Sequence, residues 1–256
     1  MDFVRIATRG SPLALAQSSM VEQALKAAHP GLRTVILPIK TSGDWVPAQG
    51  ETLLAESAGG KAQFAREIEE ALLAGKADIG VHSSKDMDSH LPDGLVMDVF
   101  LPREDARDVL FVNEAARDEG RLWGLAMDAV VGTASARRAA FLRHRRPDLQ
   151  AVPLRGNVQT RLDKLAAGQV QATLLAAAGL KRLGMEITGR FLEVGDMVPA
   201  AGQGAVGIEY AGSNEALRDI LLAIHHPETG LRVAAERAAV KALGGTCRSP
   251  IGVHAL

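Results

Sequence analysis

The sequence predicts an α/β protein with parallel sheets, because short apolar strands run into polar turns that open helices. Residues 4–8 have the apolar character of a buried strand, and an apolar run over residues 13–28 follows Ser11-Pro12. Serine favours the N-cap of a helix and proline its first position, so a helix is expected to start here. A second strand at residues 34–39 completes a strand-helix-strand unit, which favours parallel pairing.

The same pattern starts again in the middle of the chain. Residues 130–135 combine an apolar strand with a Thr-Ala-Ser turn, which leads into a helix containing Arg137, Arg138 and Phe141. Residues 7–11 have a similar Thr and Ser before the first helix. Two domains of related build are therefore expected, each offering the partial positive charge of a helix N-terminus to an anion.

The composition argues against a bulk electrostatic function. Lys and Arg number 29 against 30 Asp and Glu, so no overall charge directs the chain to nucleic acid or a membrane surface. Aromatic residues make up 4%, too few for platforms that stack nucleic-acid bases. We find no leader-like, membrane-spanning or metal-binding pattern in the sequence, and we expect a cytoplasmic protein, in agreement with its single cysteine.

A polar stretch and a helix entrance follow the first unit. Residues 41–60 are rich in Ser, Gly, Asp and Glu and are expected to form a mobile loop. The stretch ends at Gly59-Gly60-Lys61, where a lysine at a helix entrance either meets an anion or stays solvated. Both interpretations of Lys61 remain open from the residues alone.

The strand within residues 77–84 runs directly into Lys85 and Asp86. Ligands of open α/β sheets bind outside the carboxyl ends of strands, so this position favours both residues as site residues. The alternative is a surface ion pair that contributes little to stability. A further strand at residues 96–101 then leads into an expected hinge at residues 102–108.

Cations are concentrated between residues 137 and 164, a stretch that contains eight basic residues and two acidic ones. Arg143, Arg145 and Arg146 come at a helix end, where cations complement the helix dipole, so they need no ligand. Arg137, Arg138, Arg155 and Arg161 instead lie next to strand ends and are expected to converge on one cleft, and Arg182 follows the strand at 172–176. Arginine pairs two-pronged with carboxylates, so the sequence predicts a ligand with several acidic groups.

The only cysteine, Cys247, lies in a Gly-Gly-Thr-Cys-Arg turn after an expected helix at residues 228–243. A flexible, cation-flanked turn can present a thiolate as a nucleophile. The alternative is a small buried hydrophobic residue, and the turn itself does not decide between them.

Eight motifs in a fixed order resemble the porphobilinogen deaminase (hydroxymethylbilane synthase) family. They lie at residues 7–15, 78–86, 103–108, 137–138, 154–162, 178–184, 199–206 and 245–252. The sequence departs from the family pattern at Ser57, at Ala62-Gln63 and at Asp88, where we expect lysine, a glycine-led sequence and proline respectively.

The resemblance implies two domains like those of type II periplasmic binding proteins and a small third α+β domain. The first domain is expected at 1–101 and 200–224, with the second inserted at 105–197. The third, at 226–256, carries the cysteine turn. It is expected to be incomplete, since family members usually continue with more strands and a helix.

The resemblance also implies a transferase of heme biosynthesis, acting as a monomer. A dipyrromethane cofactor is expected in thioether linkage to Cys247, as primer for four porphobilinogens joined head to tail with loss of ammonia, before water releases hydroxymethylbilane. Asp86 is implied as the catalytic residue, stabilising the cationic pyrroles. Cofactor contacts are implied for Lys85, Thr133, Ser135, Arg137, Arg138, Arg161 and Gly204, and substrate contacts for Arg9, Ser11, Gln17, Lys61, Arg155, Arg182 and Gln203.

Two other functions are weighed against this one. A non-catalytic cytoplasmic protein of the same build would hold a small polycarboxylate with its arginines and keep an unmodified thiol. Thiol-dependent hydrolysis by Cys247 ranks last, because no His partner stands at a recognisable spacing.

Overall fold

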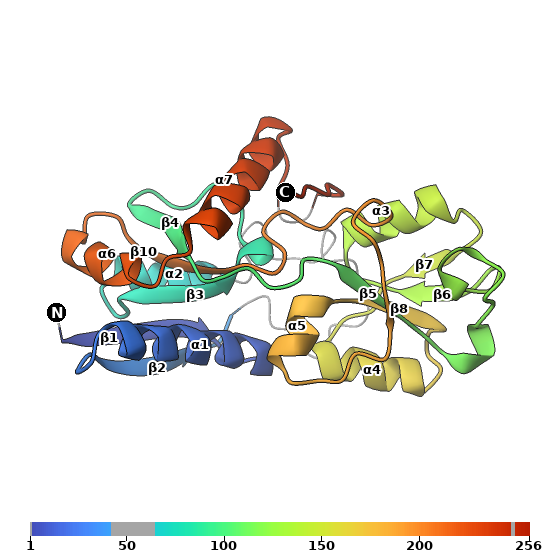
Figure 1. Cartoon of the computed structure of the whole chain (residues 1–256), viewed down its shortest axis with the longest axis horizontal. Helices are drawn as coiled ribbons and strands as arrows, with labels where there is room; N and C mark the ends of the chain where they lie inside the picture. Colours follow the sequence, from blue (N-terminus) through green and yellow to red (C-terminus); the bar gives the residue numbers. More distant parts are fainter. Residues whose placement is uncertain (1, 42–64, 247–248) are drawn as a thin grey trace.

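The computed structural model describes residues 2–41, 65–246 and 249–256. It contains two five-stranded mixed sheets, which lie end to end along the long axis of the molecule (Figure 1). We call the sheets with their flanking helices the first and second lobes. Among the described residues, none of the helices has the length and apolar character needed to cross a membrane.

The first lobe combines residues from both ends of the chain. Its sheet has the order β2-β1-β3-β10-β4, in which only β10 runs antiparallel to its neighbours. The strands are β1 (Phe3–Arg9), β2 (Arg33–Ile39), β3 (Ile79–Ser83), β4 (Leu95–Phe100) and β10 (Val206–Ala211). The helices are α1 (Pro12–Ala28), α2 (Arg66–Leu73) and α6 (Glu215–Leu222). A core of buried aliphatic residues with Tyr210 fills the space between this sheet and its helices.

The second lobe is formed by one continuous stretch of chain. Its sheet has the order β7-β6-β8-β5-β9, and again one strand, β5, runs antiparallel to its neighbours. The strands are β5 (Asp108–Val112), β6 (Val130–Gly132), β7 (Gln150–Val152), β8 (Ala172–Ala176) and β9 (Arg190–Phe191). The helices are α3 (Ala136–Arg145), α4 (Val158–Ala166) and α5 (Ala177–Arg182).

The two sheets confirm the predicted α/β class and the related build of the lobes. In each sheet, the first three of the parallel strands along the chain lie in the spatial order second, first, third. An antiparallel strand then occupies the fourth position, β10 in one sheet and β5 in the other. The local signals also hold, because Ser11 Oγ accepts from Ala14 N at 3.3 Å and Ser135 Oγ accepts from Arg138 N at 3.4 Å. Each serine therefore caps a helix that starts at the edge of the cleft.

Two crossover segments, residues 101–107 and 198–205, join the lobes. They lie side by side, since Leu101 N donates to Val206 O at 3.2 Å and Glu104 N donates to Gly204 O at 3.1 Å. Gly204 has a φ of +87°, and a side chain at this position would collide with the Glu104 carbonyl. The close contact between the crossovers thus depends on glycine.

Helix α7 (Pro227–Ala242) projects beside the first lobe and the crossovers (Figure 1). Its buried Glu236 accepts from Arg103 Nη1 at 2.7 Å, from Gly202 N at 2.6 Å and from Ala255 N at 2.9 Å. One carboxylate therefore ties this helix to both crossovers and to the segment after residue 248. The described part of residues 243–256 contains neither helix nor strand.

Candidate active site

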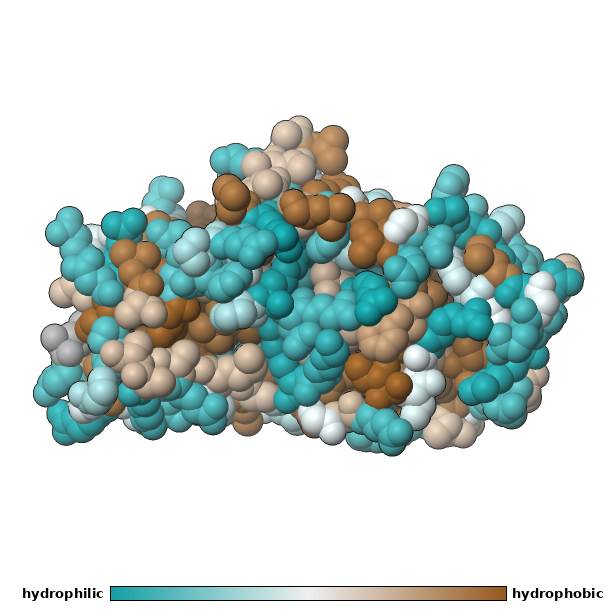
Figure 2. Space-filling model, viewed as in Figure 1, coloured by the Kyte–Doolittle hydropathy of each residue, from teal (hydrophilic) through white to brown (hydrophobic). Residues whose placement is uncertain are grey.

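A cavity of about 1120 Å³ lies between the two lobes. Figure 2 shows hydrophilic side chains over the middle of the molecule, where the lobes meet. The lining includes most of the residues that the sequence assigned to a site: Arg9, Ser11, Gln17, Lys85, Asp86, Ser135, Arg137, Arg138, Arg155, Arg161, Arg182, Gln203 and Gly204. The predicted convergence of the strand ends on one cleft is therefore present in the fold.

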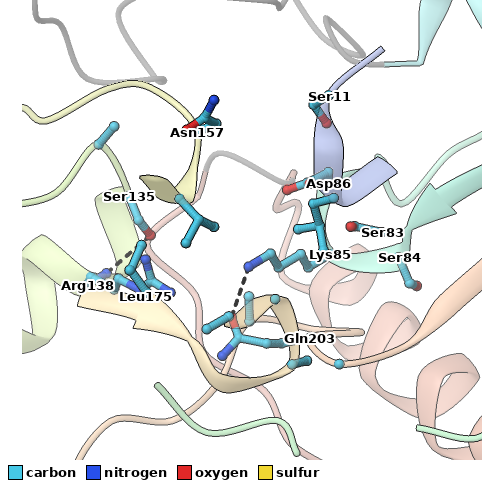
Figure 3. A pocket seen from close by; sticks show the side chains of 18 of the residues that line it. Ser11, Ser83, Ser84, Lys85, Asp86, Ser135, Arg138, Asn157, Leu175 and Gln203 are labelled. Carbon is cyan, nitrogen blue, oxygen red and sulfur yellow. Dashed lines mark hydrogen bonds between the residues drawn. The ribbon is translucent and has the colours of Figure 1, made fainter. Parts of the chain in front are cut away.

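The first lobe contributes the turns after β1 and β3. Gln17 on α1 is buried, and its Nε2 donates to Ser83 Oγ at 2.9 Å, which fixes the start of α1 against the end of β3. The chain then enters a short 3₁₀ turn, Ser84–Asp86. This turn directs Lys85 and Asp86 toward the cavity (Figure 3).

Lys85 lies among charges from both lobes. Burial lowers the pKa of its ammonium to about 8, with further lowering by Arg138 and Arg137 and opposing effects of Asp86 and Asp108. Its Nζ donates to Gln203 Oε1 at 3.4 Å (Figure 3). Lys85 is therefore a cation at neutral pH whose proton is lost more readily than that of an ordinary lysine.

Asp86 is half-buried and borders the cavity from the first lobe. Within the described part of the chain, its carboxylate accepts no hydrogen bond. An ionised carboxylate with unused acceptor sites can receive pyrrole N–H groups and stabilise positive charge on a ligand.

The second lobe contributes Arg137 and Arg138, at the start of α3. Both are more than nine-tenths buried, and both contact the fully buried Asp108: Arg137 Nη2 donates to Oδ2 at 2.7 Å, and Arg138 Nη2 donates to Oδ1 at 2.7 Å. Burial alone would raise the pKa of Asp108, but Arg138 and Arg137 hold it well below its usual range. With two guanidinium groups and one carboxylate, this cluster has one net positive charge at the cavity wall.

Two guanidinium nitrogens at the cavity wall lack partners. Arg137 Nε and Arg182 Nε are buried and have no hydrogen-bond partner among the described residues. Burial lowers the pKa of both arginines, because the nearby carboxylates, Asp108 for Arg137 and Glu104 for Arg182, do not fully offset the cost of burying the charge. A buried donor without a partner is costly, and because both Nε atoms are closed to solvent, a ligand would reach them only after these side chains shift.

The start of α4 forms another part of the second-lobe wall. Asn157 caps this helix, since its Oδ1 accepts from Thr160 N at 2.9 Å, and Arg161 Nε donates back to Gly156 O at 2.9 Å. Arg155 is buried beside it and lines the cavity. The wall is thus basic along its length, from α3 to α4 and on to Arg182 at the end of α5.

The residues around Cys247 border the same cavity. Thr246, Ser249 and Ile251 are among the lining residues, and Ser89 Oγ donates to Gly245 O at 3.2 Å. The start of the cysteine turn is therefore attached to the segment that follows Lys85 and Asp86. Cys247 itself lies outside the described residues, as do Lys61, Ser57, Ala62-Gln63 and nearly all of the predicted loop at 41–60.

One assigned residue differs in its placement, and several site residues were missed. Thr133 is buried and accepts from Ser135 N at 3.2 Å, and it is not among the residues that line the cavity. Asp108, which organises the arginine pair, was identified only as part of a hinge motif. A charged residue opening the apolar strand Val-Leu-Phe-Val was its one signal in the sequence. Arg103 was likewise identified only within that motif, and nothing in the sequence of the alanine-rich helix α7 singled out Glu236.

These features define a two-lobed α/β protein with a cavity between its lobes, whose cationic lining suits a polycarboxylate and whose border carries Asp86. A family profile described as "Porphobilinogen deaminase, dipyromethane cofactor binding domain" matches residues 4–219. The chain belongs to the porphobilinogen deaminase family, whose members polymerise porphobilinogen in tetrapyrrole biosynthesis.

Individual relatives agree with this assignment. The porphobilinogen deaminase of Nitrobacter winogradskyi is 48% identical over 252 residues, which cover 97% of this chain and 77% of the relative. The chloroplastic porphobilinogen deaminase of Oryza sativa subsp. japonica is 45% identical and covers 100% of this chain and 70% of its own length. Full-length CbnR, solved with its target DNA, shares only the fold, with a TM-score of 0.53 at 12% identity over 89% of this chain and 68% of its own.

The cavity fits the dipyrromethane cofactor of this family. Each pyrrole carries two carboxylate arms, and the lining offers the guanidinium groups of Arg155, Arg161 and Arg182, which suit carboxylates. Lys85, Arg137 and Arg138 add further cations to the same lining. Both the charge and the position of the lining thus suit a bound acidic oligopyrrole.

Proposed function

We propose that the cavity between the lobes is where this chain condenses four porphobilinogens onto a dipyrromethane primer carried by Cys247. The observation that carries this proposal is the joint lining of one cavity by Asp86, the arginines of the second lobe and the neighbours of Cys247. The family's activity is a transferase reaction that expels ammonia at each addition and yields hydroxymethylbilane. The cofactor supplies the primer pyrrole to which the first substrate is joined.

Asp86 is the proposed catalytic residue. At each addition the C–N bond of the substrate's aminomethyl group breaks and ammonia leaves with the bonding electrons. A cationic pyrrole remains. Its methylene carbon forms the new C–C bond with the α-carbon of the terminal pyrrole of the growing chain, and this α-carbon then releases its proton. The Asp86 carboxylate, open toward the cavity, stabilises this positive charge and accepts pyrrole N–H groups.

Holding the acidic arms is the proposed role of the cations. Arg137, Arg138 and Arg161 with Lys85, Ser135 and Gly204 hold the cofactor, whereas Arg9, Ser11, Gln17, Arg155 and Arg182 contact the substrate. The basic wall extends over two helices and the end of a third, so successive acidic pyrroles can find cations in different parts of one cavity. For the Lys61 ammonium, substrate contact stays a prediction from the sequence.

We further propose that the chain acts as a monomer in the cytoplasm, with no nucleic-acid or membrane partner. The nearly equal numbers of acidic and basic residues support this proposal. Light scattering coupled to gel filtration tests the oligomeric state, and a dimer mass would overturn it.

Incubation of the purified chain with porphobilinogen tests the function. The expected result is one ammonia released per substrate consumed, with a linear tetrapyrrole as product. The competing function is a binding protein for a small polycarboxylate, and it predicts reversible binding of porphobilinogen without ammonia. Asp86→Asn is the matched variant, because it should keep the cavity and its cations but stop turnover.

A further inference from the structure

Gln203 occupies the point where the two lobes and the two crossovers meet. Its side chain is 1% exposed, and both atoms of its amide are used. Nε2 donates to Ala106 O at 2.6 Å and to Asp108 Oδ1 at 2.9 Å, while Oε1 accepts from Lys85 Nζ at 3.4 Å. Lys85 belongs to the first lobe and Asp108 to the second, so one amide connects the charged groups of both.

The backbone around Gln203 is built to hold this amide in place. Gly202 and Gly204 on either side have φ values of +72° and +87°, which suit glycine and few other residues. Ser84 is the residue before Lys85, and a Cβ at Gly202 would lie only 2.5 Å from its Oγ, too close for any side chain. The Gln203 carbonyl accepts from Arg103 Nε at 2.9 Å, and the Gly204 carbonyl from Arg182 Nη2 at 2.6 Å. The turn is therefore fixed against the first crossover, the end of α5 and the Lys85 turn.

The connection continues from Asp108 to the arginine pair. Besides the amide of Gln203, the Asp108 carboxylate accepts from Arg137 Nη2 and from both Nε and Nη2 of Arg138. Arg138 Nη1 donates to Leu174 O, and Arg137 Nη1 to Val198 O, at 2.7 Å each. A continuous chain of contacts thus leads from Lys85 through Gln203 and Asp108 to the guanidinium groups at the opposite wall.

We propose that Gln203 is a positioning residue, whose amide sets the Lys85 ammonium of the first lobe relative to the Asp108–arginine cluster of the second. This inference rests on the proposed function, in which Lys85, Arg137 and Arg138 hold the cofactor. It assigns Gln203 an action through these groups in place of the substrate contact implied by the family resemblance, because its buried amide bridges charged groups of both lobes.

The charges around Lys85 give this role a distinct signature. The groups that face it are Asp86 on its own turn, Arg137 and Arg138 on α3, and Asp108 on β5. With Lys85 included, three cations face two carboxylates, so the cluster has one net positive charge. A carboxyl at position 203 keeps an acceptor for Lys85, but its second oxygen lies against the Ala106 carbonyl and Asp108 Oδ1, so we expect it to be protonated and to donate there as the amide does. An apolar side chain removes the acceptor and lowers the pKa of Lys85.

Two variants that differ in their polar atoms test the proposal. Gln203→Glu keeps the acceptor for Lys85, and Gln203→Met keeps the side-chain length without any polar atom. We expect the pKa of Lys85 to stay close to that of wild type in the first and to fall by a few tenths of a unit or more in the second. The readout is an NMR titration of ¹³C-dimethylated lysines in the protein carrying its cofactor, with Lys85→Arg used to assign the signal.

Turnover adds a second readout. We expect kcat to fall roughly tenfold or more in Gln203→Met with cofactor attachment retained and the alkaline limb of its pH–rate profile moved to lower pH, whereas Gln203→Glu should keep both close to wild type. Gln150→Met, at an exposed glutamine on β7, is the matched control and should behave as wild type. An unchanged Lys85 pKa in both variants overturns the proposal even if wild type is active, whereas an inactive wild type overturns the proposed function instead.

Discussion

The two lobes share one sheet order but present their aspartates differently. In the first lobe, Asp86 follows β3, borders the cavity and accepts no hydrogen bond from the described residues. In the second lobe, Asp108 opens β5, is fully buried and accepts from Arg137, Arg138 and Gln203. The same topology therefore provides one carboxylate whose acceptor sites stay open at the cavity and another that holds two arginines of the cavity wall in place.

The cations differ between the lobes in the same way. Lys85 and Arg9 are the charged donors at the first-lobe wall, and the second lobe supplies Arg137, Arg138, Arg155, Arg161 and Arg182. Reaction chemistry is thus assigned mainly to the first lobe and recognition of acidic arms mainly to the second. Each of the following experiments changes one side of this division.

Loss of the buried aspartate should have the largest effect. Asp108→Asn leaves two buried guanidinium groups without their carboxylate, and we expect a loss of about 3–5 kcal/mol in the free energy of unfolding. Urea denaturation measures it. Asp105→Asn is the control, because its pair with the half-buried Arg107 should contribute at most about 1 kcal/mol. Equal losses in the two variants would show that Asp108 does not organise the second lobe.

Loss of the open aspartate should affect catalysis instead of stability. In Asp86→Asn we expect kcat to fall about 100- to 1000-fold, because a charge that stabilises the cationic pyrrole is removed. The midpoint of thermal unfolding should change little, since no described group hydrogen-bonds this carboxylate. Asp93→Asn, at an exposed turn of the same lobe, serves as the control. Turnover within a few-fold of wild type would end the assignment of Asp86.

The recognition side can be tested at Arg155. Removal of one charge-assisted contact to a carboxylate costs about 1.5–3 kcal/mol, so Arg155→Gln should raise KM about tenfold or more with a smaller change in kcat. Arg143→Gln on the exposed part of α3 should leave both constants unchanged. A drop confined to kcat would place Arg155 with the reaction chemistry and contradict the division between the lobes.

An effect that depends on pH concerns Glu69, a buried acid of the first lobe outside the cavity. Burial raises the pKa of Glu69 on α2 to about 7, with further contributions from Glu209 and Asp88. Between about pH 4.5 and 7, Glu69 is therefore protonated in the folded protein but ionised in the unfolded chain. The stability that comes from burying the neutral acid is complete below pH 4.5 and is lost as pH rises through 7, because the buried side chain must then ionise.

Glu69→Gln should therefore be more stable than wild type at pH 8, by up to about 3 kcal/mol, and close to wild type at pH 4.5. Thermal unfolding at the two pH values measures the difference. Glu186→Gln, at an exposed position of the second lobe, should show no such dependence. The same gain at both pH values would contradict a protonated Glu69.

Much of the fold and of the cavity lining could be predicted from the sequence, because the signals are local. Ser11 and Ser135 marked helix starts, and Lys85 and Arg155 came shortly after apolar strands. Strand ends of one sheet meet at one edge, so such residues come together even without knowledge of the packing.

The partners of these residues could not be predicted in the same way. Arg138 contacts Asp108, which is 30 residues away in the sequence, and the amide of Gln203 contacts Asp108 over a sequence separation of 95 residues. No local pattern encodes such contacts, since they depend on how β5, β8 and the crossovers pack. For the same reason Thr133, next to a correctly identified helix start, faces the interior.

The most direct test of the account is the mass of the intact chain under denaturing conditions, after expression in cells that make porphobilinogen. We predict a mass above that of the polypeptide by two linked pyrrole units, stable to denaturation and absent from Cys247→Ser. A wild-type chain with only the polypeptide mass would contradict the claim that this protein builds its product on a primer fixed to Cys247.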